Sequence, residues 1–282
     1  MLEKGIVIVV TGHSYYGRMA YCLALSIKAV DPSVQIAIMY NGNALNHLGT
    51  DQYEFFDHVI KLDDSVPSNP ICKLYGALLS PFDKTIVLDA DTLWLPFNQP
   101  SKVFDELEGV DFTGITEGRE DDPHPQYFFW ANVEEIKEKY KLKTQIYQWR
   151  SEFIYFTRAG RRILERALEI TLNPGLDSVM KFAYNVPDEL GINIATAEAG
   201  VLPHQYKFIP TYWPMMHGNS IPAISQLGLK YYLVSFGSNR ASNTVRGVYD
   251  IIMGAACTAI KRRHVFPLIQ KKDFLPKERN LM

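Results

Sequence analysis

The stretch that decides the fold is Lys-Thr-Ile-Val-Leu-Asp-Ala-Asp, residues 84–91, in which an apolar run ends in two acids separated by one small residue. An uninterrupted apolar run of this length is typical of a strand that is buried on both faces, as in a parallel sheet. In open α/β sheets, ligands bind beyond the carboxyl ends of the strands. The two carboxylates, Asp89 and Asp91, therefore stand where a binding site is expected.

Strands and helices alternate on both sides of this stretch. β-branched runs and helical apolar spacing follow one another along the chain, which predicts an α/β fold with a mainly parallel sheet and helices on both faces. The expected strands are Gly5–Thr11, Val34–Tyr40, His58–Leu62, Lys84–Leu88, Asp111–Thr116 and Glu152–Thr157. The expected helices are Tyr16–Val30, Ile71–Leu79, Arg161–Leu172, Pro187–Ala199 and Ile251–Ile260, and Pro96 and Pro100 are expected to interrupt the chain.

The 282 residues contain no long linker, so we expect one domain over residues 1–250. Residues 117–148 are polar and aromatic, and we interpret them as an insertion or lid. Its rings are expected either to stack on a ligand or to pack the lid itself. Residues 251–282 are expected to form a helix and a basic tail, with seven Lys/Arg against two Asp/Glu.

Charge and cysteine content restrict the partners and the compartment. The formal net charge of −2 gives no reason to expect nucleic acid or a membrane as partner of the whole molecule. A weak contact between the basic tail and an anionic surface is one interpretation, and a solvated tail is the other. The three cysteines fit neither a disulfide framework nor a zinc site. With no apolar run long enough for a signal peptide or a membrane span, we expect a cytoplasmic location.

Three further residues could act beside the acidic pair. Carboxylates on the loop after a buried strand can hold Mg²⁺ or Mn²⁺ against a diphosphate, although an acidic pair in a turn or helix cap has the same spacing. Lys73 lies on the helix before that strand and could reach a phosphate, or could be a surface lysine. Asp188 begins a helix and could simply compensate the helix dipole. His217 could complete a metal site or could be a packed histidine.

The order of these motifs resembles that of the glycogenin-like family of retaining glycosyltransferases, which have the Rossmann-like GT-A fold and use UDP-sugars with Mn²⁺. Lys73 and Asp89-Ala90-Asp91 are similar to the family's phosphate-binding lysine and metal motif. The segment Thr11–Ile27 resembles its first strand and helix and implies nucleotide contacts at Thr11 and Tyr16. Asp188 matches the family's carboxylate beside the anomeric carbon of the donor.

The resemblance covers residues 5–240 and has three departures. The family's Asn-Ser-Gly segment near the sugar is Arg-Ser-Glu here, at residues 150–152, which leaves the donor sugar open. The segment around His217 matches the metal-binding histidine motif only in part. Glu189 replaces the usual glutamine.

The resemblance implies a metal-dependent hexosyltransferase-like enzyme. It would move a hexose or pentose from a UDP-sugar to a hydroxyl acceptor with retention, using Mn²⁺ or Mg²⁺ on Asp89, Asp91 and His217 and using Lys73 and Asp188 in catalysis. A glycan, protein, lipid-linked or modified nucleic-acid hydroxyl is the acceptor to be expected. Two alternatives remain: a sugar-phosphate nucleotidyltransferase, and a non-catalytic nucleotide-sugar or carbohydrate-binding module.

Overall fold

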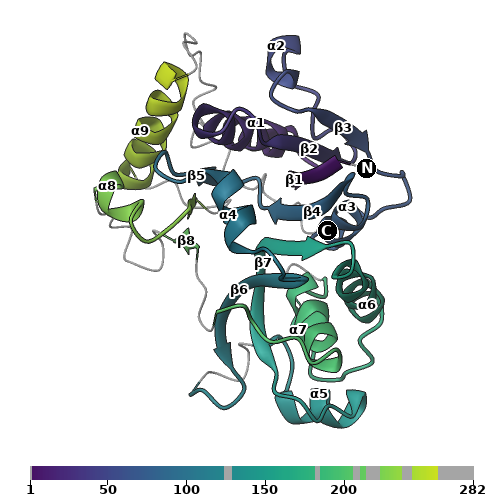
Figure 1. The fold of residues 1–282 in the computed structure, drawn as a ribbon. Coiled ribbons are helices and arrows are strands. Elements are labelled where there is room, and N and C mark those ends of the chain that lie inside the picture. Colours follow the sequence, from purple (N-terminus) through teal and green to yellow (C-terminus); the bar gives the residue numbers. More distant parts are fainter. Residues whose placement is uncertain are drawn as a thin grey trace.

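The computed structural model describes residues 2–123, 129–181, 185–205, 210–213, 223–236 and 243–259, excluding the side chains of 224 and 243–250. A six-stranded sheet in the order β3-β2-β1-β4-β7-β6 forms its centre, as Figure 1 shows. The strands are β1 (Leu2–Val10), β2 (Gln35–Tyr40), β3 (His58–Lys61), β4 (Phe82–Leu88), β6 (Phe112–Arg119) and β7 (Tyr147–Thr157).

Five of these strands run in one direction and one runs against them. β3, β2, β1 and β4 are paired in parallel, β7 pairs antiparallel with β4, and the edge strand β6 pairs antiparallel with β7 and so has the direction of β4. The expected mainly parallel sheet is therefore confirmed, with one antiparallel strand, β7, that the strand pattern did not predict. Because β7 runs against β4, the middle of β7 lies beside the carboxyl end of β4.

Alternate strand residues face two separate cores. In β1, Ile6 and Ile8 pack into one core and Val7 into the other. The first core is covered by α1 (Ser14–Val30), α4 (Pro100–Glu106) and α9 (Asn243–Ala259), and the second by α3 (Cys72–Leu78), α5 (Val133–Tyr140), α6 (Arg161–Leu172) and α7 (Asp188–Glu198). Figure 1 shows α9 beside α1, and α6 and α7 together on the opposite side of the sheet. Helices on both faces are thus confirmed.

A second, three-stranded sheet in the order β5-β9-β8 lies against the first core. It consists of β5 (Thr92–Trp94), β8 (Thr211–Tyr212) and β9 (Leu233–Ser235). Two short helices, α2 (Thr50–Tyr53) and α8 (Ile224–Leu227), complete the elements of the described residues. Pro100 does not interrupt the chain but occupies the first turn of α4, where its missing N–H costs no hydrogen bond.

Parts of the region expected to be an insertion or lid belong to the sheet and to the second core. Residues 117–119 belong to β6, residues 147–148 to β7, and α5 lies between them. Phe129 and Trp149 are buried and Trp130 and Tyr147 are partly buried against the same core, so packing, not ligand stacking, explains these four rings. Tyr127 and Phe128 lie outside the described residues.

Two features of the structure bear on membrane insertion and on disulfide formation. Within the described ranges, no helix combines the length and apolarity needed to cross a bilayer. Cys22, Cys72 and Cys257 are buried thiols.

The expected helix near the C-terminus is α9, which begins eight residues earlier than expected, at Asn243. The basic tail lies outside the described residues.

Candidate active site

Asp89 and Asp91 occupy a tight turn between β4 and β5. The carbonyl of Asp89 accepts hydrogen bonds from the backbone N–H of Thr92 at 3.2 Å and from its hydroxyl at 2.8 Å. The flanks are held as well: the N–H of Asp89 donates to the carbonyl of Glu152 in β7, and the carbonyl of Asp91 accepts from the N–H of Phe236. Both sheets therefore fix this turn, which explains why two acids can be half-buried together.

A cavity of about 500 Å³ opens beside this turn, at the carboxyl edge of the parallel strands. Its wall contains the six residues that are expected to contact the nucleotide: Thr11, Tyr16, Lys73, Asp89, Ala90 and Asp91. Gly12, with φ of +73°, makes the turn from β1 toward α1 along the same wall, and His13 caps α1 by accepting from the N–H of Tyr15. The geometry brings the predicted residues together; their roles stay predictions.

Segments on opposite sides of the cavity are linked. The side chain of Asn69, just before α3, donates to the side-chain oxygen of Asn185, just before α7, at 3.1 Å, and both residues line the cavity. This contact brings the N-terminal turn of α7, and with it Asp188, to the side of the cavity that carries Lys73.

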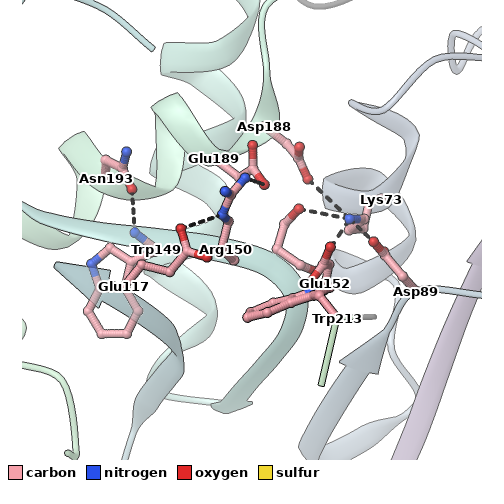
Figure 2. Close-up of polar contacts among 11 residues, drawn as sticks. Lys73, Asp89, Glu117, Trp149, Arg150, Glu152, Asp188, Glu189, Asn193 and Trp213 are labelled. Atoms are coloured by element: carbon pink, nitrogen blue, oxygen red, sulfur yellow. Dashed lines mark hydrogen bonds and ion pairs between the residues drawn. The ribbon is translucent and has the colours of Figure 1, made fainter. Parts of the chain in front are cut away.

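Lys73 is the cation at the centre of the site. Its Nζ lies 2.6 Å from Asp89 Oδ1 and 3.7 Å from Asp188 Oδ2 (Figure 2). It also donates to Ser151 Oγ at 2.8 Å. Burial opposes the charged form, but the charges of Asp89 and Asp188 outweigh it and raise the pKa of Lys73 above its usual range. The side chain is therefore an ammonium, not the surface lysine of the alternative interpretation.

The carboxylates outnumber the cations and repel one another. Burial, and then the charge of Asp89, raise the pKa of Asp91 to about 7. Burial, followed by the charges of Asp89 and Asp91, raises the pKa of Glu152 to about 8. Burial also raises the pKa of Asp89, although Lys73 opposes that shift. Such shifts mean that a further positive charge at this place would stabilise the ionised carboxylates.

The residues present fit a hard divalent ion. Mg²⁺ is usually held by one or two carboxylates together with substrate phosphates, and Asp89 and Asp91 are a pair of that kind beside a cavity. Their mutual repulsion, seen in the raised pKa of Asp91, is what a bound cation would relieve. Within the described residues, no group of three His, Cys, Asp or Glu is arranged to bind a metal. His217, the predicted third ligand, lies outside them.

Asp188 stands at the first turn of α7 and is almost fully buried, with a side chain only 6% exposed. Its Oδ2 has no hydrogen bond from the residues that the structure describes. A buried carboxylate oxygen without a hydrogen bond is costly unless a ligand or a cation serves it. Dipole compensation alone does not require such burial, so the position of Asp188 favours a role in the site.

Residues 150–152 of β7 form part of the site, although in the sequence they stand out only as a departure from the family pattern. Arg150 donates to Glu117 at 2.8 Å and lies 3.7 Å from Glu189 (Figure 2). Glu152 accepts a 2.6 Å hydrogen bond from the indole of Trp213. Three consecutive polar residues, two of them charged, in a strand rich in aromatic residues were the available signal, because a central strand rarely holds charges without a partner.

No protein-family model matches this chain, and no curated protein matches it in sequence. Among solved structures, it is similar to the galactosyltransferase LgtC in complex with donor and acceptor sugar analogues, with a TM-score of 0.54 and 14% identity over 96% of this chain and 100% of LgtC. An active-site variant of LgtC gives a TM-score of 0.53 and 15% identity over 89% of this chain and 95% of its own. The apo form of the bifunctional glycosyltransferase WbbM gives 0.52 and 12% identity over 93% of this chain and 52% of WbbM.

At such identities the likeness concerns the fold. The chain has the mixed α/β fold of GT-A glycosyltransferases, with the predicted site at the carboxyl edge of its sheet. The fold expectation is therefore confirmed. The comparisons support the GT-A fold, but they do not confirm membership of the glycogenin-like family.

Proposed function

We propose that this chain is a metal-dependent glycosyltransferase that moves a hexose or pentose from a UDP-sugar to a hydroxyl acceptor with retention. The observation that carries the proposal is the cavity lined by Thr11, Tyr16, Lys73, Asp89 and Asp91 at the carboxyl edge of a GT-A sheet. Two of the similar structures are of the galactosyltransferase LgtC, and one of them contains donor and acceptor sugar analogues. This similarity supports a sugar donor for the same fold.

The cavity is suited to a nucleoside diphosphate. Its volume of about 500 Å³ is within the usual range of ligand sites, and Tyr16 supplies an aromatic face beside Gly12. The diphosphate would lie against the carboxylates of Asp89 and Asp91 through a divalent ion, and against Lys73. The ion supplies electrostatic stabilisation of the leaving diphosphate when it is bound.

The residues of the chain divide the remaining work. Lys73 is held as an ammonium and can neutralise a phosphate oxygen as charge develops on the leaving group. Asp188 Oδ2 lies 3.7 Å from the Nζ of Lys73. We expect its carboxylate to face the sugar and to stabilise positive charge at the anomeric carbon. Arg150 holds Glu117 and Glu189 nearby.

The first test is a donor screen by thermal shift. UDP-glucose, UDP-galactose, UDP-N-acetylglucosamine, UDP-xylose and GDP-mannose are added to the wild type and to Asp91→Asn, each with and without Mn²⁺. We expect one UDP-sugar to raise Tm with Mn²⁺, by the equivalent of about 2.7 kcal/mol at a hundredfold excess over its Kd. Asp91→Asn should lose that shift because it loses a metal ligand. Shifts indifferent to Mn²⁺ and to Asp91 would exclude the proposal and favour a binding module or a nucleotidyltransferase.

The role of Asp188 is tested by Asp188→Asn, which preserves the shape of the side chain. Turnover with the donor found above should fall by at least a hundredfold, because a carboxylate that stabilises developing charge is worth several kcal/mol in the transition state. The Tm of the free variant should remain close to that of the wild type. Unchanged turnover at unchanged Tm would remove Asp188 from the mechanism.

A further inference from the structure

Lys73 has no donor left for a ligand in the free protein. A lysine ammonium carries three N–H donors. Three acceptors lie within hydrogen-bond distance of Nζ: Asp89 Oδ1 at 2.6 Å, Ser151 Oγ at 2.8 Å and the carbonyl of Ser151 at 3.3 Å. The contact with Asp89 is the shortest. A phosphate can bind Lys73 only by replacing one of these partners.

The two kinds of partner differ in how easily they are replaced. Ser151 is buried in β7, and its contacts come from a backbone carbonyl and a short side chain that the sheet holds in place. Asp89 stands at the edge of the cavity with its side chain 24% exposed. Asp89 is therefore the partner that a ligand can take away, and Ser151 is the partner that remains.

Asp89 is also one of the two carboxylates that fit a divalent ion. Lys73 and the ion then compete for the same carboxylate, while Asp89 and a diphosphate compete for the same ammonium. Each ligand relieves the competition that the other meets: the ion gives Asp89 a new cation, and the diphosphate gives Lys73 a new anion. The ion therefore frees Lys73 for the diphosphate, and the diphosphate frees Asp89 for the ion. Two ligands that assist one another in this way bind with positive coupling.

Resting on the proposed function, we propose that Lys73 exchanges Asp89 for the diphosphate when the ligands bind, pivoting on Ser151, so that metal and nucleoside diphosphate enter the site cooperatively. In the free protein, Lys73 stands in for the metal at Asp89. The exchange makes either ligand alone a weak binder and the pair a strong one. Ser151 acts as a positioning residue, because it keeps the ammonium at the same edge of the sheet before and after the exchange.

The sharpest test measures UDP binding without metal, because the contact between Lys73 and Asp89 then opposes UDP binding most strongly. Calorimetric titrations of UDP in EDTA are compared for the wild type, Asp89→Asn and Asp91→Asn. Both variants remove one negative charge from the same turn, but only Asp89→Asn weakens the contact that holds Lys73. We expect Asp89→Asn to bind metal-free UDP at least fivefold more tightly than Asp91→Asn, although both lose Mn²⁺-dependent binding.

A double variant identifies Lys73 as the source of this gain. Adding Lys73→Met to Asp89→Asn should abolish the advantage over Asp91→Asn, whereas Lys28→Met, which removes a lysine paired with Asp57 away from the cavity, should not change it. Ser151→Ala should lower the metal-free UDP affinity of Asp89→Asn, because the released ammonium loses its anchor. Thermal unfolding curves verify that each variant is folded.

The failures are distinguishable. If Asp89→Asn and Asp91→Asn bind metal-free UDP equally, while the wild type binds UDP with Mn²⁺, the exchange is wrong and the proposed function stands. If the wild type binds no UDP with or without Mn²⁺, the proposed function is wrong and the exchange falls with it.

Discussion

At the scale of single residues, this protein concentrates buried carboxylates around few cations. Glu189 is an example: its side chain is only 13% exposed, its nearest cation, Arg150, is 3.7 Å away, and Arg150 is shared with Glu117. Burial, and then the charge of Asp188, raise the pKa of Glu189 to about 7. A glutamate with an ordinary pKa of about 4.3 in the unfolded chain therefore takes up a proton on folding between these two values.

This uptake predicts the direction in which pH changes stability. Because the folded state binds the additional proton, the free energy of unfolding should decrease as pH rises from about 4.3 to about 7. Glu189→Gln cannot titrate, so its stability should depend less on pH, by about 1–3 kcal/mol over this interval. Urea unfolding at pH 5, 6, 7 and 8 measures the difference. Parallel pH profiles for the wild type and Glu189→Gln would contradict the raised pKa.

At the scale of elements, the position of Asp188 depends on how closely α7 packs against α6. A Cβ at Gly191 would come within 2.1 Å of the Thr171 hydroxyl and 2.3 Å of the Ala167 carbonyl, so only glycine permits this distance between the helices. The hydroxyl of Thr171 is itself bonded to the Ala167 carbonyl and cannot move away freely. The close approach sets where the first turn of α7 meets the cavity.

Gly191→Ala should therefore destabilise the protein by about 1–3 kcal/mol, the usual cost of overpacking a core. It should also weaken UDP binding, because α7 would shift together with Asp188. Gly254→Ala is the matched control: Gly254 is exposed in α9 and a Cβ there would contact nothing within 4 Å. That change should stabilise the helix by up to about 1 kcal/mol. Tm values for the two variants test the contrast, and a neutral Gly191→Ala would show that the helices can separate.

At the scale of the whole molecule, one sheet joins two cores. Phe104 of α4 is buried in the first core and Phe156 of β7 in the second, and the strands between them contribute side chains to both. If one core unfolds, it exposes one face of the same sheet whose other face is covered by the second core. The expectation that residues 1–250 behave as one domain stays a prediction, and the cooperativity of unfolding tests it.

Phe104→Ala and Phe156→Ala test this cooperativity. Each should lower the free energy of unfolding by about 3–5 kcal/mol, as truncation of a buried phenylalanine does. Both should shift a single unfolding transition, seen at the same temperature by calorimetry and by circular dichroism. Two separated transitions in either variant would mean that the two faces unfold independently.

Most of the sheet and the acidic pair were predictable from the sequence, because local patterns carry them. The apolar run before Asp89 specifies a buried strand, and the order of strands and helices specifies a layered α/β fold. α6 was predicted with the bounds that the structure has, Arg161–Leu172, because its amphipathic spacing is regular. Of the six predicted cavity residues, Thr11 and residues 89–91 follow the ends of β1 and β4, whereas Tyr16 and Lys73 lie on α1 and α3.

Only the tertiary structure decided which charges face one another. The antiparallel pairing of β7 with β4 puts Ser151 beside Lys73 and Glu152 beside Asp89, although these residues are far apart in the chain. Strand direction and register depend on long-range pairing, which the local pattern of one strand does not encode. The sequence by itself determined the kinds of residue at the site and the edge where they gather. The fold decided their partners, and with them the charge state of the site.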